Sequence, residues 1–193
     1  FVATLLYDLN AKKDKGYYLE IGAGDPININ NTYALEKNYG WQGISIDISA
    51  DLASQWADFR SNSLLVADAL NIDYHSLLKG FPHVIDYLSL DIDGYYDKVL
   101  EKVLLTGHLF KIITIEHDAY RYGDLYRNKE REILEKMGYK LVCANVCNKR
   151  APFEDWWIHP DFFSGSSQFL LSHKWENKES VEIIQDIKSL LAP

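Results

Sequence analysis

The stretch Tyr18-Leu19-Glu20-Ile21-Gly22-Ala23-Gly24-Asp25 runs from an apolar strand into two glycines flanked by acidic residues. Glycines at this point let the backbone turn tightly and approach a ligand, at the end of a first strand where doubly wound sheets bind nucleosides. Ile27 stands where a dinucleotide fingerprint has its third glycine, which disfavours a cofactor with a pyrophosphate. Glu20 and Asp25 would instead suit a cationic amino-acid group. The alternative is an ordinary turn between a strand and a helix.

Short β-rich runs alternate with amphipathic segments of helical length along the chain, a pattern typical of a parallel sheet covered by helices on both faces. The expected strands are 17–21, 43–47, 63–66, 85–90, 111–115, 140–144 and 168–172, and the expected helices are 32–39, 52–59, 72–78, 98–105, 125–137 and 181–191. The segment 145–167 has neither pattern, and its length indicates a functional loop. The sequence therefore predicts an α/β fold with a doubly wound, seven-stranded and mostly parallel sheet.

Length and composition restrict the class of protein. The 193 residues fit one domain spanning 1–193, and a first residue other than Met is compatible with a domain excised from a longer polypeptide. A formal charge of -8 without a basic stripe disfavours nucleic acid as a partner, and no apolar run approaches the length of a membrane span. Cys143 and Cys147 are expected to be buried thiols in a reducing compartment, which favours the cytoplasm.

Two further acidic residues follow the next two expected strands. Asp47, followed by Ile48, lies close to the spacing from Gly22 at which a carboxylate accepts hydrogen bonds from ribose hydroxyls. Asp68, followed by Ala69, could accept a hydrogen bond from an adenine amino group. Either residue alone could be a solvated loop residue, but together with the glycine turn they predict a nucleoside site.

Three segments resemble the opening of FkbM-type methyltransferases: 19–25, 31–36 and 39–47, with weaker similarity continuing through Leu88-Ser89-Leu90-Asp91-Ile92-Asp93-Gly94. The resemblance covers about residues 17–157. It implies a class I methyltransferase fold of the Rossmann-like type, S-adenosylmethionine as methyl donor, and a sugar or polyketide hydroxyl as acceptor. Asp93-Gly94 departs from the family's usual Glu-Gly. The donor-binding residues expected from the motifs and the resemblance are Glu20, Gly22, Ala23, Gly24, Asp47, Ile48, Asp68, Ala69 and Asp91.

Titratable residues also follow the fourth and fifth expected strands. Transfer of a methyl group to a hydroxyl requires in-line approach and loss of a proton, and a neutral imidazole suits that task near pH 7. We therefore predict His117 as the catalytic base, with Asp91 and Asp93 as the alternative catalytic residues. Asp91, Glu116 and His117 could also bind Mg or Mn, although a histidine fits such hard ions less well than oxygen ligands do.

The acceptor is expected to meet aromatic and polar residues near the fifth strand and in the segment 145–167. Flat aromatic faces beside polar groups suit a sugar, although large aromatic residues more often pack in a core. The candidates are Tyr120, Arg121, Glu154, Trp156 and Trp157. The sequence thus predicts an O-methyltransferase acting on a sugar, a glycan or a glycosylated small molecule. The alternatives are a nicotinamide-dependent sugar oxidoreductase, disfavoured by the missing Tyr-x-x-x-Lys pair, and a non-catalytic nucleoside-binding domain.

Overall fold

The computed structural model describes residues 1–9, 15–163, 165, 167–173 and 175–191. The chain divides into two compact units: a first unit of residues 15–110 and a second unit formed by the described residues of 1–14 and 111–193. Among the described residues, no helix combines the length and the apolar character that crossing a membrane requires.

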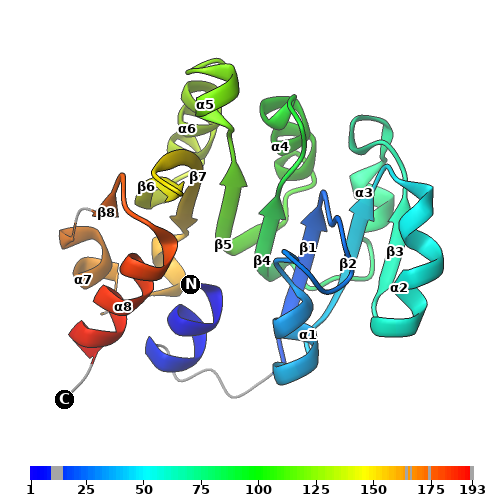
Figure 1. Ribbon diagram of the computed structural model, residues 1–193, viewed down its shortest axis with the longest axis horizontal. Coiled ribbons are helices and arrows are strands. Elements are labelled where there is room, and N and C mark those ends of the chain that lie inside the picture. The colour runs from blue at the N-terminus through cyan, green and yellow to red at the C-terminus, as the bar shows by residue number, and fades with distance from the viewer. Residues whose placement is uncertain (10–14, 164, 166, 174, 192–193) are drawn as a thin grey trace. The chain divides into compact units, whose positions relative to one another are not determined.

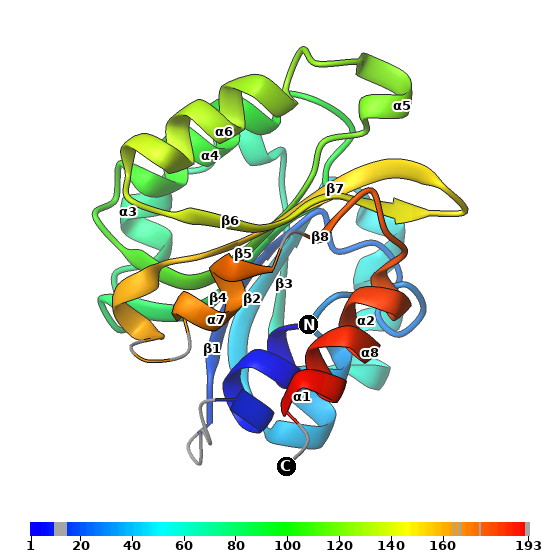
Figure 2. The ribbon, with the colours of Figure 1, turned by 90° about the vertical axis from the view of Figure 1, so that its left-hand side faces the viewer.

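The first unit contains a parallel sheet in the order β3-β2-β1-β4. Its strands are β1 (Tyr17–Ile21), β2 (Gln42–Asp47), β3 (Ser63–Val66) and β4 (Val84–Leu90). Its helices are α1 (Tyr33–Tyr39), α2 (Ala53–Phe59), α3 (Tyr74–Leu77) and α4 (Tyr96–Leu104), with short 3₁₀ turns η2 (Ala50–Leu52) and η3 (Ala69–Asn71). Within this unit α1 and α2 lie on one face of the sheet and α3 and α4 on the other (Figures 1 and 2).

The strand order reverses at β1. The chain moves from β1 outward to β2 and β3, then returns so that β4 pairs with the opposite edge of β1. In doubly wound sheets, ligands bind beside such a reversal, outside the carboxyl ends of the strands. The apolar residues Leu19 and Ile21 are fully buried, as expected for a central parallel strand covered on both faces.

The second unit contains strands in the order β5-β7-β6-β8, with β7 antiparallel to both neighbours and β8 parallel to β6. The strands are β5 (Leu109–Glu116), whose first two residues belong to the first unit, β6 (Lys140–Asn148), β7 (Ala151–Ile158) and β8 (Trp175–Glu176). Its other elements are the π-helical segment η1 (Thr4–Leu9), α5 (Ala119–Tyr122), α6 (Arg127–Lys136), η4 (Pro160–Phe162), α7 (Ser167–Ser172) and α8 (Ser180–Leu191). Cys143 and Cys147 are buried, unpaired thiols, as expected.

Two sequence-based expectations for the second unit are wrong. The predicted strand at 168–172 is helix α7, because an apolar run of that length does not distinguish a strand from a buried helix. Most of the expected loop at 145–167 is the β6–β7 hairpin, although residues 164 and 166 lie outside the described part of the chain. Lys149 and Arg150 form its turn with φ of 50° and 66°, and neither gives the Asn-Gly signal typical of that geometry. The described residues therefore form eight strands rather than seven, and those of the second unit are not mostly parallel.

Candidate functional site

A cavity of about 540 Å³ lies at the carboxyl ends of the first unit's strands. This volume falls within the range of about 300–1,000 Å³ common for small-molecule sites. The strands β1, β2, β3 and β4 all contribute the residues that follow them, so the cavity coincides with the reversal of strand order. Its lining residues are Ile21, Gly22, Ala23, Gly24, Ile29, Ile46, Asp47, Ile48, Ala67, Asp68, Ala69, Leu70, Asp91, Ile92, Asp93, Gly94 and Tyr95.

The charged residues of this lining are all acidic. Asp47, Asp68, Asp91 and Asp93 come from three different strand ends, and no described lining residue is basic. Parallel strands bring their carboxyl ends to one edge of a sheet, which explains why acids distant in sequence meet here. Such a cavity favours a ligand that carries positive charge over one that carries a pyrophosphate.

Asp47 ties the loop after β1 to the loop after β2. Its Oδ2 accepts a hydrogen bond from the Gly24 amide at 2.8 Å, and its Oδ1 accepts one from the Ser49 amide at 2.8 Å. Each carboxylate oxygen has two lone pairs, so both can still accept a hydrogen bond from a ligand hydroxyl. Asp68 caps η3 in a similar way, because its Oδ1 accepts from the Leu70 amide at 2.9 Å.

Gly22 lines the cavity, as its sequence motif suggests, and it also has a second role. Its φ is 85°, and a Cβ atom built on it would lie 1.6 Å from the carbonyl oxygen of Asp91. The Asp91 amide in turn donates to the carbonyl oxygen of Ile21 at 2.8 Å. Gly22 therefore permits close contact between the loops after β1 and β4, whereas Gly24, with φ of 58°, faces open space.

Glu20 does not line the cavity. Its carboxylate is fully buried and accepts hydrogen bonds from Ser45 Oγ at 2.6 Å and from Thr32 Oγ1 at 2.9 Å. Burial raises the pKa of Glu20 from 4.5 to about 7, against the opposing effects of Ser45 and the nearby Arg60 charge. Glu20 is therefore placed to support the floor of the site rather than to contact a ligand directly.

Arg60 organises the loop between β1 and α1, and the sequence pattern did not single it out. Its buried guanidinium donates to Thr32 Oγ1 at 2.8 Å, to Asn30 Oδ1 at 3.0 Å and to Glu36 Oε2 at 2.6 Å. Its cationic group also lies 4.5 Å from the ring centroid of Trp56. These contacts fix the loop without placing a positive charge in the cavity lining.

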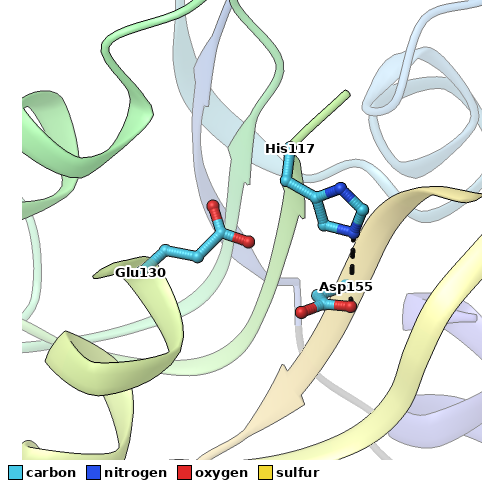
Figure 3. A group of neighbouring side chains, drawn as sticks. All are labelled: His117, Glu130 and Asp155. Atoms are coloured by element: carbon cyan, nitrogen blue, oxygen red, sulfur yellow. Dashed lines mark ion pairs between the residues drawn. The ribbon is translucent and has the colours of Figure 1, made fainter. Parts of the chain in front are cut away.

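His117 lies in the second unit and is fully buried (Figure 3). Its Nδ1 accepts a hydrogen bond from the Ala119 amide at 3.2 Å, and its Nε2 lies 3.5 Å from Asp155 Oδ1. Nδ1 acts as the acceptor, so we assign the proton of the neutral ring to Nε2, on the side of Asp155. Both ring nitrogens thus face groups inside the unit, which leaves neither directed at a substrate hydroxyl in this conformation.

Among the described residues, His117, Glu130 and Asp155 form the one group of three candidate metal ligands, with ligand atoms within 4.8 Å of one another (Figure 3). Asp155 already accepts a bidentate contact from Arg131, at 2.7 and 2.9 Å, and a hydrogen bond from the Asn145 amide at 2.7 Å. Burial alone would raise the pKa of Asp155, but His117 and Arg131 together hold it below its ordinary value.

The cluster of His117, Glu130 and Asp155 fits a divalent ion poorly, because Arg131 already supplies the positive charge that Asp155 needs. The predicted metal ligands Asp91 and Glu116 are not part of this cluster. Asp91 lies in the first unit and lines its cavity, whereas Glu116 ends β5 in the second unit.

The expected acceptor residues all lie in the second unit and differ in exposure. Tyr120 and Arg121 are exposed on α5, with the Arg121 cation 5.0 Å from the ring centroid of Tyr122. Trp156 stacks on Phe1 and donates its indole hydrogen to Glu154, while Trp157 is fully buried. The two tryptophans therefore have the placement of packing residues, the alternative left open by the sequence.

The cavity includes eight of the nine predicted donor-binding residues, all except Glu20, and also the predicted catalytic residue Asp93. Sequence reasoning missed several apolar lining residues, notably Ile29 and Tyr95. Tyr95 follows Asp93-Gly94 directly and could have been found by extending that motif. Ile29 has no local signal, because its place depends on how the loop after β1 folds back.

Solved structures similar to this chain include several methyltransferases. An S. pombe Dnmt2 methyltransferase has a TM-score of 0.56 and 11% identity, over 75% of this chain and 49% of that one. A putative rRNA methylase from Clostridium thermocellum has a TM-score of 0.53 and 13% identity, and the match covers 76% of this chain and 87% of the methylase. A TehB-like SAM-dependent methyltransferase from Corynebacterium glutamicum has a TM-score of 0.51 and 14% identity, and the match covers 82% of this chain and 86% of that methyltransferase. No family model and no curated protein matches the sequence.

The chain therefore has the α/β fold of class I S-adenosylmethionine-dependent methyltransferases. At such low identity the likeness establishes the fold, and the function has to be argued from the cavity itself.

Proposed function

We propose that this chain is an S-adenosylmethionine-dependent O-methyltransferase that modifies a hydroxyl group of a sugar, a glycan or a glycosylated small molecule. The observation that carries the proposal is the acidic cavity at the strand reversal of a methyltransferase fold. S-adenosylmethionine has a cationic sulfonium and a cationic ammonium, and a described lining that includes four aspartates and no Lys or Arg suits both charges.

The donor would lie along the carboxyl ends of β1, β2 and β3. Asp47 would accept from the ribose hydroxyls and Asp68 from the adenine amino group, with Ile48 and Ala69 beside the nucleoside. The methionine end would extend over the turn at 22–24 toward Asp91. This arrangement uses carboxylate oxygens that keep a free lone pair in the structure.

In the reaction, the acceptor oxygen forms a bond to the methyl carbon while the bond from that carbon to sulfur breaks. Sulfur leaves as the neutral thioether of S-adenosylhomocysteine, and the hydroxyl proton passes to a base. Asp91 and Asp93 line the cavity where the methyl group would point, whereas His117 is fully buried, with Nδ1 accepting from the Ala119 amide and Nε2 beside Asp155. We therefore favour a carboxylate at Asp93 as the proton acceptor, with Asp91 holding the donor.

The choice of acceptor rests on the resemblance to FkbM-type methyltransferases in the segments 19–25, 31–36 and 39–47. Tyr120 and Arg121 are exposed and remain candidates for contact with a sugar. A formal charge of -8 supports a small or carbohydrate acceptor over nucleic acid. We further propose that the chain acts in the cytoplasm, without a membrane partner.

A thermal-shift comparison tests the function. S-adenosylhomocysteine at 100 times its dissociation constant should stabilise the protein by about 2.7 kcal/mol, while NAD should not. Stabilisation by NAD alone would favour the oxidoreductase alternative. If S-adenosylhomocysteine binds, a panel of monosaccharides and glycosides read out by mass spectrometry should show one product heavier by a methyl group. Binding without any product across the panel would favour a non-catalytic nucleoside-binding domain.

A further inference from the structure

Ile29 has an unusual combination of properties at the cavity. Its side chain lines the cavity, yet it is 100% exposed, and its φ of 54° lies in the left-handed region. Among the described non-glycine residues with positive φ, it is the one with a β-branched side chain. A β-branched residue is a genuine outlier in this region, and a fully exposed isoleucine gains nothing from burial.

The residues on both sides of Ile29 impose its conformation. On one side, Asp25 Oδ1 accepts hydrogen bonds from the amides of Ile27 at 2.8 Å and Asn28 at 2.7 Å. On the other side, Asn30 Nδ2 donates to the carbonyl oxygen of Ala23 at 3.0 Å. Asn30 Oδ1 in turn accepts from the Tyr33 amide at 2.7 Å and from Arg60. These hydrogen bonds hold the loop in place on both sides of Ile29. The exposure of the Ile29 side chain is therefore a fixed feature of the loop.

An exposed apolar side chain held in a strained conformation at the edge of a cavity is stabilised when a ligand covers it. Two other apolar side chains of the lining, Ile48 and Tyr95, are also largely exposed, at 74% and 50%. The occupant must therefore offer apolar surface as well as the positive charge that the aspartates favour. S-adenosylmethionine has both, in its adenine ring and in the methylene groups around its sulfonium.

We propose that Ile29 is an apolar clamp that packs against the bound methyl donor, and that the free protein holds it in a less stable conformation for this purpose. The inference rests on the proposed function, since it takes the donor as the occupant. It has an uncommon consequence: removal of the isoleucine should stabilise the free protein and weaken donor binding at the same time.

The test uses Ile29→Asn with S-adenosylhomocysteine as the probe. Asparagine tolerates left-handed φ and has no apolar surface to expose, so the melting temperature of the free protein should rise by about 2–4 °C. The dissociation constant measured by calorimetry should rise about tenfold or more, the loss expected when one buried aliphatic side chain is removed from a contact. Ile29→Leu, which keeps an apolar side chain, should bind within about threefold of the parent.

Lys149→Asn is the matched control. Lys149 also has a left-handed φ, 50°, and is exposed, but it lies in the turn of the β6–β7 hairpin and does not line the cavity. This variant should raise the melting temperature without changing the affinity for S-adenosylhomocysteine.

Unchanged affinity in Ile29→Asn would overturn the clamp, and so would a lower melting temperature, which would indicate a purely structural role. A parent protein that does not bind S-adenosylhomocysteine would instead overturn the proposed function, and the clamp with it.

Discussion

The Cβ atom that Gly22 lacks would lie 1.6 Å from the backbone carbonyl oxygen of Asp91. The loops after β1 and β4 therefore contact each other so closely at Gly22 that there is room for a hydrogen atom on its Cα but not for a side chain. A backbone oxygen cannot move aside as a flexible side chain can, and Gly22 also has a φ of 85°. Both features make this position intolerant of any side chain.

We expect Gly22→Ala to lower the free energy of unfolding by about 3 kcal/mol or more, because overpacking against the backbone adds to the strain of a positive φ. Gly24→Ala is the control, since Gly24 has φ of 58° with open space around it, and it should cost only about 1 kcal/mol. Urea denaturation measures both. Equal losses in the two variants would contradict the close contact with Asp91.

Asp47→Ala should weaken the binding of S-adenosylhomocysteine by about 1–3 kcal/mol. A ligand hydroxyl would lose its hydrogen-bond acceptor, and the Gly24 amide would lose its hydrogen bond to Asp47. Asp73→Ala is a matched control outside the cavity, since Asp73 likewise accepts from a backbone amide, that of Ser76 at 3.2 Å. Calorimetry should show a raised dissociation constant only for Asp47→Ala. If Asp47→Ala binds S-adenosylhomocysteine as tightly as the parent, the ribose does not lie at Asp47 and must bind in another part of the cavity.

Stability should depend on the ionisation of Glu20. The pKa of this buried carboxyl is about 7 in the folded protein against 4.5 for an ordinary glutamate, so the folded state binds the proton more tightly. The resulting stability is fully present below pH 4.5 and is lost as the pH rises through 7. The free energy of unfolding should therefore fall by about 3 kcal/mol across this window. Tyr18, whose pKa is raised by burial, stays neutral throughout this window.

Glu20→Gln should remove this pH dependence, because the amide mimics the protonated acid. Denaturation of the parent and the variant between pH 4.5 and 8 measures the difference. Glu132→Gln serves as the control, since Glu132 is exposed and its contact with Lys136 lowers its pKa, so it titrates below the window. A difference between the parent and Glu20→Gln that stays constant with pH would show that Glu20 has an ordinary pKa.

Asp93→Asn should lower kcat by about 10²–10⁴, the loss typical of a missing base, and leave the affinity for S-adenosylhomocysteine unchanged. His117→Asn should instead lower the free energy of unfolding by about 1–3 kcal/mol, because Asp155 would lose a buried neighbour, with less than a tenfold effect on kcat. Steady-state kinetics and thermal melts of both variants separate these effects. A folded His117→Asn protein that binds the donor but turns over at least 100 times more slowly would restore the histidine as base.

Chelation should leave the rate of methyl transfer unchanged. Arg131 occupies both oxygens of Asp155, so the cluster with His117 and Glu130 has no need of a cation. The measurement is turnover after dialysis against EDTA, with metal content checked by elemental analysis. Activity lost on chelation and recovered with Mg or Mn would show that a metal is required after all.

Local sequence patterns were enough to place most of the first unit. The strands 17–21 and 63–66 were predicted with their observed bounds, because apolar runs bounded by turn residues depend on neighbouring positions only. The acids Asp47, Asp68 and Asp91 could be assigned to one cavity because parallel strands gather their carboxyl ends at the same edge. This assignment requires only the order of strands and helices along the chain, and no knowledge of the distances between residues.

Contacts between residues far apart in the sequence were beyond such reasoning. The burial of Glu20 depends on Ser45 in the neighbouring strand, and the requirement for Gly22 depends on a carbonyl oxygen in the loop after β4. His117 was predicted as the catalytic base, yet Asp155 from an unforeseen antiparallel strand lies beside its ring. Sequence periodicity indicates which side of a helix or strand is apolar. The contacts that a side chain makes with residues distant in sequence depend on strand register and side-chain packing, which arise only when the whole chain folds.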